Sequence, residues 1–408
     1  MNAMGFAWRS LVRQPARASL GVIGVAAVGA LLFDMLLLSH GLVISMRDLF
    51  ERAGFDVRVA ASDALPGQGP ALTDASAHAA AIARLPSVRA AIALRLANAV
   101  VQKDPQGDSP STAQNPASRG IYTAFQGAAG TGARPWTILR GHDIGTAADL
   151  VVNENIARRI GIQPGDRVIV RGSCTNGNEA LPPMTFVVTG VAEFPFDAPN
   201  GATVATSLER LSEACGGNER GEADVILVAA ADGVGSEAAA ADVAKAVPAL
   251  RVFSNAQIVS RFERGGFTYF RQISTVLTTV TLSFAVLLIT VLLTVSVNQR
   301  LGEIAALRAL GFSRWRVVAD VLCESILIVG GGGLLSLPLG AMLAFGLDRI
   351  LKRIPGIPAD VHFFVFEPAA LEVHAGLLVA TAIIAALYPI RIVASLPIAA
   401  TLRDEVIG

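Results

Sequence analysis

The side chains of this sequence that could carry chemistry are few, and they form no catalytic motif. The 408 residues contain no G-x-x-x-x-G-K-[ST] segment, so no phosphate-binding loop for a nucleotide is encoded. Neither H-E-x-x-H nor G-x-S-x-G occurs, and the five histidines are scattered without the spacing of metal ligands. We therefore expect no catalytic residue, no metal site and no cofactor in this chain.

Cys174 and Cys215 are candidates for covalent chemistry of a structural kind. Both fall in the long segment between the first two apolar runs of the chain. If that segment lies outside the cytoplasm, its oxidising surroundings favour a disulfide between the two residues. Two separate buried thiols are the alternative. The third cysteine, Cys323, lies in an apolar run, where we expect it to be a packing residue.

Two carboxylates, Asp34 and Glu324, lie in or near apolar runs. A carboxylate at the centre of a bilayer costs about 2.5–3.5 kcal/mol on insertion scales, and less near an interface. Each is therefore expected to have a partner, to face water or to carry a proton. Placement at the outer interface is the simplest interpretation for Asp34. For Glu324, near the inner end of its run, a contact with the arginines of the preceding segment is what the family resemblance given below implies.

Composition places these residues in a membrane protein. The chain is 52% hydrophobic and 16% charged, and its mean hydropathy is +0.53. Its net charge is +0, and no basic patch interleaved with aromatic residues occurs, so we expect no nucleic-acid partner. Four apolar runs come near the ~20 residues that a membrane span requires. They are residues 18–38, 271–298, 319–347 and 371–390.

The first run has an alternative interpretation as a signal peptide, with Arg9, Arg13 and Arg17 as its basic region. Its apolar part exceeds the usual ~7–15 residues, and no small-x-small cleavage site follows promptly. We therefore interpret it as a span.

Basic residues predict the topology, because Arg and Lys accumulate in short loops on the cytoplasmic side. The segments expected in the cytoplasm are residues 1–17, 299–318 and 391–408, and the loop expected outside is residues 348–370. One observation disagrees, since Arg349, Lys352 and Arg353 fall in that outer loop. Acidic residues of the same loop partly offset them.

The third run has a face of small residues. Gly332, Ser336 and Gly340 recur every four positions, which allows two membrane helices to approach closely. The neighbouring Gly330–Gly333 run is not a phosphate-binding loop, because it lies inside an apolar span and no Lys follows it. Pro338 is expected to kink the helix.

Between the first two runs lie roughly 220 residues, a normal size for a folded domain. We expect an extracytoplasmic α+β domain over residues 46–270. Its first part, residues 56–148, should mix helices and strands, beginning with a half-buried strand at 56–60. Its second part, residues 150–229, should be rich in strands, with a short helix at 153–160 ended by Gly161. Residues 255–270, capped by Ser254 or Asn255, should form a stalk helix leading into the second span.

The predicted cytoplasmic segment 299–318 is a short amphipathic helix held between two spans. Leu301, Ile304, Ala305 and Phe312 share one face at 100° per residue, and Arg308 falls within that face. Such a helix could lie on the membrane surface with its arginine reaching the headgroups. It could equally dock on a cytoplasmic partner with an acidic rim. These residues alone leave both alternatives open.

The same segment carries a resemblance to a known family. Arg300, Glu303-Ile304, Leu307-Arg308 and Gly311, followed by Glu324-Ser325 and a glycine-rich span, resemble the FtsX-like permease domain of MacB-type ABC transporters. The basic N-terminal helix and the C-terminal Pro389…Pro397…Leu402-Arg403 pattern are similar to the ends of that domain.

The resemblance implies the permease subunit of an ABC transporter in a bacterial cytoplasmic membrane, with both termini in the cytoplasm. Residues 299–318 would be the coupling helix, and a separate ATPase subunit would bind ATP and Mg. A second copy of the chain or a paralogous permease would complete the membrane part, in contact with lipids. Some members of the family add a periplasmic adaptor and an outer-membrane duct.

Two functions fit the resemblance. The chain could transmit ATPase-driven motion to its outer domain and so export or extract an amphipathic substrate, such as a lipid, lipoprotein, peptide or drug. Alternatively, it could be a signalling subunit that activates a periplasmic hydrolase or a sensor without transporting anything. The large outer domain favours transport.

Overall fold

The chain folds into two compact units, each described here by itself. The computed structural model describes residues 5, 9, 11–13, 15–64, 69–104, 120–145, 148–174, 181–217, 220–264, 268–299, 301–302, 304–305, 313–354, 358, 361–366 and 368–394. The membrane unit comprises residues 1–44, 265–351 and 362–408. The outer unit comprises residues 45–264 and 352–361.

Four helices are long and apolar enough to cross a membrane. They are α2 (Pro15–Arg52), α8 (Thr268–Asn298), α10 (Arg314–Leu351) and α11 (Pro368–Ala394). The first helix ends at Arg52, well beyond the predicted end of the span at residue 38. Hydropathy locates the apolar run but not the end of the helix, which continues to the buried residues Leu49 and Phe50 of the outer unit.

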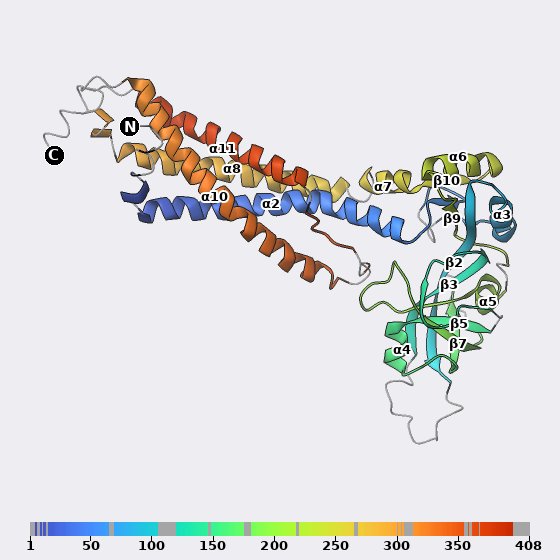
Figure 1. The fold of residues 1–408 in the computed structure, drawn as a ribbon. Helices are drawn as coiled ribbons and strands as arrows, with labels where there is room; N and C mark the ends of the chain where they lie inside the picture. Colours follow the sequence, from blue (N-terminus) through green and yellow to red (C-terminus); the bar gives the residue numbers. More distant parts are fainter. Residues whose placement is uncertain are drawn as a thin grey trace, which may run out of the picture. The chain divides into compact units, whose positions relative to one another are not determined.

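The four helices of the membrane unit are drawn in Figure 1. They share an apolar core. Helix α11 packs against both α8 and α10. The core takes small and branched residues from all four helices: Val25, Ile289, Leu293, Ile328, Val329, Leu378, Ala382, Ala385 and Ala386. A second cluster joins Phe33 and Leu37 of α2 to Ala344 of α10 and Ala370 of α11.

The outer unit is built on one ten-stranded sheet. Its strands run in the order β10-β1-β9-β2-β3-β8-β5-β7-β4, and β6 pairs with both β2 and β7. The bounds are β1 Val57–Ala60, β2 Val88–Lys103, β3 Ile121–Thr131, β4 Thr137–Gly141, β5 Asp149–Asn153, β6 Arg167–Ser173, β7 Met184–Glu193, β8 Thr203–Ser207, β9 Val225–Ala230 and β10 Arg251–Ser254. Among the pairings of the described strands, β3–β8 and β5–β7 alone are parallel.

Strand pairing closes six of these strands into a ring, β2-β3-β8-β5-β7-β6, which returns to β2. The ring encloses Phe125, Leu150 and Phe186, with α4 (Glu154–Ile160) and α5 (Leu208–Ala214) packed on it. Strand β2 is 16 residues long, and its first part pairs instead with β9. There the sheet continues to β1 and β10 and packs on α3 (Ala75–Ile82) and α6 (Ser236–Ala246).

The sheet does not divide near residue 149, where the sequence suggested a boundary between a mixed part and a strand-rich part. Strand β2, from the predicted first part, contributes to the closed ring, while β9, from the predicted second part, lies outside it. The sheet is divided by the length of β2 and not by position along the chain. Pairings of strands far apart in sequence leave no trace in local composition.

Local signals were more informative. Helix α4 begins after Asn153, whose side chain accepts a hydrogen bond from Ile156 N, and it ends at Gly161 with φ 64°, as predicted. Helix α7 (Asn255–Arg264) begins with a reciprocal cap, because Ser254 and Gln257 each bond the other's backbone N–H. The predicted continuation of α7 through Gly265 and Gly266 lies outside the described residues.

Strand β1 differs from expectation, since all four of its residues are buried. Its polar residue, Arg58, was expected to face water. Instead, Arg58 bonds Asn255 and lies over the ring of Phe50.

Candidate functional site

Of the predicted coupling helix 299–318, the structure describes residues 299, 301–302 and 304–305 at its start and 313–318 at its end, and α10 already begins at Arg314. Arg300, Glu303, Leu307, Arg308 and Gly311 lie outside the described residues. Ile304 is buried and forms a small apolar cluster with Val297 of α8 and the partly buried Leu301 and Ile392. This side chain faces its own chain, so it anchors the segment to the ends of α8 and α11.

Glu324 lies near the same end of the membrane unit. Its side chain is buried, and its Oε1 accepts a hydrogen bond of 2.8 Å from Ser296 Oγ on α8. The contact ties the first turns of α10 to the last turns of α8. The arginines Arg300 and Arg308, with which a contact was considered, are not among the described residues.

Asp34 is more enclosed than expected. It is 1% exposed, and neither carboxylate oxygen has a hydrogen-bond partner within the described part of the chain. The Asp34 side chain therefore does not face water in this conformation. The adjacent Phe33 and nearby Leu37 pack against Ala344 and Ala370 and close the helices around this stretch.

The small residues of α10 lie against α2. A Cβ on Gly332 would come within 2.6 Å of Val25 Cβ, and one on Gly340 within 3.0 Å of Phe33 Cδ1. Real Cβ contacts are essentially never closer than 3.0 Å, so a larger residue at 332 requires a shift of its neighbours. At residue 340 the approach is tight, and the Phe33 ring would have to give way slightly. The stripe Gly332, Ser336 and Gly340 is the surface on which the two helices approach each other.

His374 of α11 was not singled out in the sequence, yet it joins this contact. It is 2% exposed, and its Nε2 lies 3.0 Å from Ser336 Oγ. Because the Ser336 hydroxyl donates to Gly333 O, the histidine contact requires an Nε2–H donor. The ring also packs 5.2 Å from that of Phe33. A histidine within a long apolar run is the signal that could have identified it.

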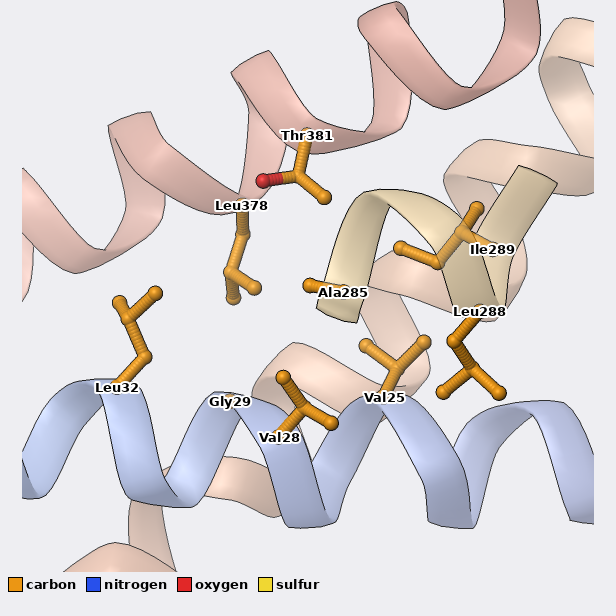
Figure 2. Close-up of a pocket in the computed structure, with 9 residues that line it drawn as sticks. All are labelled: Val25, Val28, Gly29, Leu32, Ala285, Leu288, Ile289, Leu378 and Thr381. Atoms are coloured by element: carbon orange, nitrogen blue, oxygen red, sulfur yellow. The ribbon is translucent and has the colours of Figure 1, made fainter. Parts of the chain in front are cut away.

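A cavity lies between α2, α8 and α11 in the membrane unit (Figure 2). Its lining is almost entirely apolar: Val25, Val28, Gly29, Leu32, Ala285, Leu288, Ile289, Leu378 and Thr381. Its volume is about 10 Å³, which is room for about one water molecule. This cavity cannot hold a substrate and reflects imperfect packing of the helices.

The outer unit holds the disulfide that the sequence favoured. Cys174 follows β6 and Cys215 follows α5, and their Cα atoms are 5.4 Å apart. The bond closes a separation of 41 residues and ties α5 to the edge of the strand ring. Cys323 is free.

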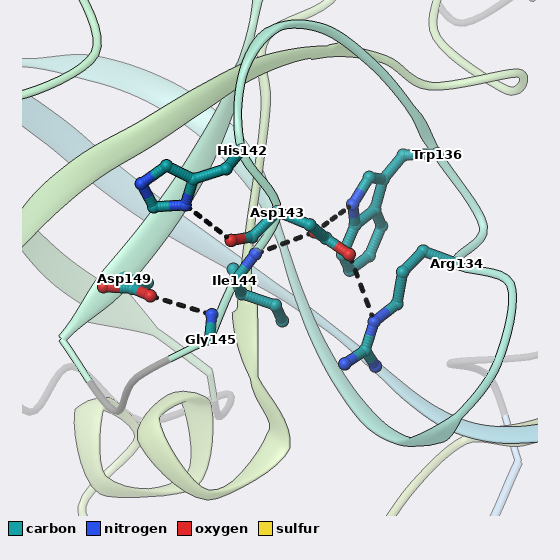
Figure 3. A network of polar contacts seen from close by, with 7 residues as sticks. All are labelled: Arg134, Trp136, His142, Asp143, Ile144, Gly145 and Asp149. Atoms are coloured by element: carbon teal, nitrogen blue, oxygen red, sulfur yellow. Dashed lines mark hydrogen bonds and ion pairs between the residues drawn. The ribbon is translucent and has the colours of Figure 1, made fainter.

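A polar network surrounds Asp143 in the loop after β4 (Figure 3). Its carboxylate accepts from Trp136 Nε1 at 2.9 Å and from Ile144 N at 2.8 Å, and it pairs with Arg134 Nε at 3.4 Å. Asp149 accepts from Gly145 N nearby. These contacts hold the loop in place, so we interpret the network as structural. Among the described residues, no three His, Cys, Asp or Glu side chains are placed to hold a metal ion.

Comparison with known families accounts for both units. The model of the MacB-like periplasmic core domain matches residues 19–246, and the model of the FtsX-like permease C-terminal domain matches residues 275–398. The chain belongs to the MacB/FtsX family of ABC permeases. No curated protein matches its sequence.

Two solved structures are similar to the outer part of this permease. The periplasmic region of MacB from Actinobacillus actinomycetemcomitans is 11% identical with a TM-score of 0.38, and the match covers 53% of this chain and 98% of that one. The extracellular domain of the noncanonic ABC-type transporter YknZ from Gram-positive bacteria is also 11% identical, with a TM-score of 0.33. That match covers 49% of this chain and 99% of the other.

The family and fold predicted from the sequence are confirmed. One N-terminal and three C-terminal apolar helices flank a large domain of helices and strands, as in a multi-pass MacB/FtsX permease. The first family match covers α2 and nearly all of the outer unit, and the second covers most of α8 with α10 and α11. Members of this family are permease subunits and are generally non-catalytic.

Proposed function

We propose that this chain is the membrane subunit of an ABC transporter that passes ATPase-driven motion to its outer unit. The observation that carries the proposal is the combined match of a periplasmic core domain and an FtsX-like permease domain in one chain. ATP and Mg are bound by a partner ATPase. Residues 299–318 dock on that partner in the cytoplasm, where both termini also lie, and the membrane is the bacterial inner membrane.

The close packing of the helices favours transmission of motion to the outer unit over passage of a substrate through the membrane unit. The cavity between α2, α8 and α11 has room for about one water molecule. Small residues hold α2 against α10 without a gap for a ligand. An amphipathic substrate, of the lipid, lipoprotein, peptide or drug class, is therefore engaged by the outer unit or at the outer leaflet.

A second copy of the chain pairs through α8. One face of this helix exposes apolar side chains three or four residues apart: Ile273, Leu277, Val280, Phe284, Leu287, Val291 and Val295. Beside them, Thr275, Thr279 and Ser283 form an exposed stripe of small residues. Small residues flanked by branched ones favour close helix–helix contact in a membrane. The exposed face of α11, with Val379 and Ile383, faces lipid instead.

Affinity purification of the tagged chain from its native membrane tests the proposal. We expect an ABC ATPase to co-purify in stoichiometric amount, and ATP hydrolysis by that subunit to depend on the chain. A cysteine at Phe284 should cross-link two copies, whereas one at Val379 should not. Purification without an ATPase, or cell-wall hydrolysis stimulated with no ATP-dependent release of lipid or lipoprotein, would contradict transport.

A further inference from the structure

Two side chains of the outer unit, Arg58 and Phe196, contact Phe50 near the C-terminal end of α2. Phe50, near the end of the helix, is buried. The guanidinium carbon of Arg58 lies 4.3 Å from the centre of its ring, and the ring of Phe196 lies 5.9 Å away. The helix that comes from the membrane is thus held by β1 and by the loop between β7 and β8.

Arg58 also contacts the first residue of α7, Asn255. Its Nη1 donates to Asn255 Oδ1, and Asn255 Nδ2 donates to Phe55 O at 3.0 Å. The backbone N–H of Asn255 also bonds Asp56 O at 2.9 Å. Asn255 is the first residue of α7, whose chain continues toward α8. One buried side chain therefore touches both the end of α2 and the beginning of α7.

The cation at this position is unusual in being buried. Arg58 is 8% exposed, and burial lowers its pKa to about 10, while the Asp56 carboxylate acts in the opposite direction. It therefore stays charged at neutral pH. A buried charge persists only where its surroundings compensate for lost hydration, and removing its partners is strongly destabilising. The ring of Phe50 and the amide of Asn255 supply that compensation.

The Phe196 loop is itself fixed to the strand ring. Asp197 accepts from Asn153 Nδ2 at 2.6 Å and from the hydroxyl of Thr203, the first residue of β8. Asn155 adds a bond to Pro199 O. A displacement of Phe50 would thus reach the ring of strands through Phe196 as well as α7 through Arg58.

We propose that Phe50, Arg58 and Asn255 form a clasp that makes α2, α7 and the Phe196 loop move together. This inference rests on the proposed function, because it names the residues that receive the motion in the outer unit. A nearby pair offers a matched comparison. Arg261 lies 4.2 Å from the ring of Phe253 and pairs with Asp63, so it has the same chemistry. Its side chain is 45% exposed, and α2 does not take part in this pair.

The test uses the full chain in complex with its ATPase. Spin labels at Leu31 of α2 and Asp232 of the outer unit, in a Cys323→Ser background, report the distance between the two parts with and without ATP. Both positions are exposed. We compare the native clasp with Asn255→Ala, Arg58→Met and Arg58→Lys, and with the control Arg261→Met. Limited proteolysis checks that each outer unit is folded.

The native chain should show a nucleotide-dependent change in this distance. Asn255→Ala and Arg58→Met should reduce the change at least about fivefold, the lower end of common coupling between sites. ATPase association and hydrolysis should stay at the native level. Arg58→Lys should recover part of the change because it keeps the cation over Phe50, and Arg261→Met should behave as native.

A native-size change in Asn255→Ala, with the outer unit intact, would overturn the clasp while leaving the proposed function standing. Should Arg58→Met prove unfolded, Asn255→Ala and Arg58→Lys decide the question. An equal loss in Arg261→Met would show that any altered cation–ring pair has this effect, and it too would overturn the clasp. Absence of any nucleotide-dependent change in the native chain would remove both proposals.

Discussion

Ser336 of α10 lies against Gly29 of α2, so closely that a Cβ on residue 29 would stand 2.8 Å from Ser336 Cβ. The same hydroxyl bonds Gly333 O and contacts His374, so it cannot turn away without losing these contacts. The first span, the third and the fourth thus meet at one serine. These three helices can approach one another at Ser336 because residue 29 has no side chain.

Replacing Gly29 with Ala should therefore separate α2 from α10. Overpacking of this kind costs about 1–3 kcal/mol, and we expect the membrane unit to unfold at correspondingly lower temperature or SDS fraction. Gly330→Ala on α10 is the matched control, because nothing lies within 4 Å of a Cβ there. Equal stability of the two variants would show that the α2–α10 contact is looser than described.

The disulfide prediction concerns Cys174 and Cys215. The unreduced chain should contain one reactive thiol, from Cys323, and the reduced chain three. In the chain-entropy model, a bridge over this separation contributes roughly 4 kcal/mol, so Cys174→Ser should markedly weaken the outer unit. Thiol titration under denaturing conditions provides the count. Three thiols in protein never exposed to reductant would contradict the bond.

Asp197 should make the stability of the outer unit depend on pH. Burial raises the pKa of its carboxyl, and hydrogen bonds from Thr203 and Asn153 oppose this only in part. The folded state therefore holds the proton more tightly than the unfolded state. This stabilisation is fully present below the unfolded pKa of about 3.9 and is lost as pH rises through the raised folded pKa.

Asp197→Asn should remove that part of the pH dependence and should gain stability over the native chain at neutral pH. The measurement is resistance of the outer unit to proteolysis or heat at several pH values above 4. Asp232→Asn is the control, since the Asp232 side chain is 93% exposed. Identical pH profiles for native chain and Asp197→Asn would refute the assignment.

Membrane topology is tested by labelling from outside the cell. A cysteine at Ser313, ahead of α10, should be shielded from an impermeant thiol reagent, whereas one at Asp232 should react. Both positions are exposed, so access depends on the side of the membrane and not on burial. The background should carry Cys323→Ser. Labelling of the residue 313 variant in intact cells would end the four-span topology.

Local sequence signals predicted much of this fold. Apolar runs located the four spans, and Asn153 and Gly161 bounded α4. The spacing of Gly332, Ser336 and Gly340 indicated a helix-packing face, which the structure places against α2. These features depend on residues within a few turns of one another. The residue pattern from Arg300 to Gly311 also identified the family, which the family models confirm.

What the sequence could not predict depends on distant pairing. The strand ring needs β2 beside β6, and the clasp needs Arg58 beside Asn255, which is 197 residues away. From the sequence alone, an arginine in a short alternating segment is predicted to lie on the surface, because its distant partners are not known. Asp34 and His374 were likewise misjudged or missed, because enclosure by other helices is invisible within one apolar run.

The central claim is that residues 299–318 couple this permease to an ATPase, and Arg308→Glu tests it most directly. A charge reversal in a docked helix places a like charge against an acidic rim, and losing such an anchor commonly costs about 2 kcal/mol or more of binding. Co-purification with the ATPase and the rate of ATP hydrolysis in the reconstituted complex are measured beside Arg9→Glu, the same reversal in the N-terminal segment. The account predicts loss of both in Arg308→Glu alone. Native association and hydrolysis in Arg308→Glu would contradict it and favour a helix that only rests on the membrane surface.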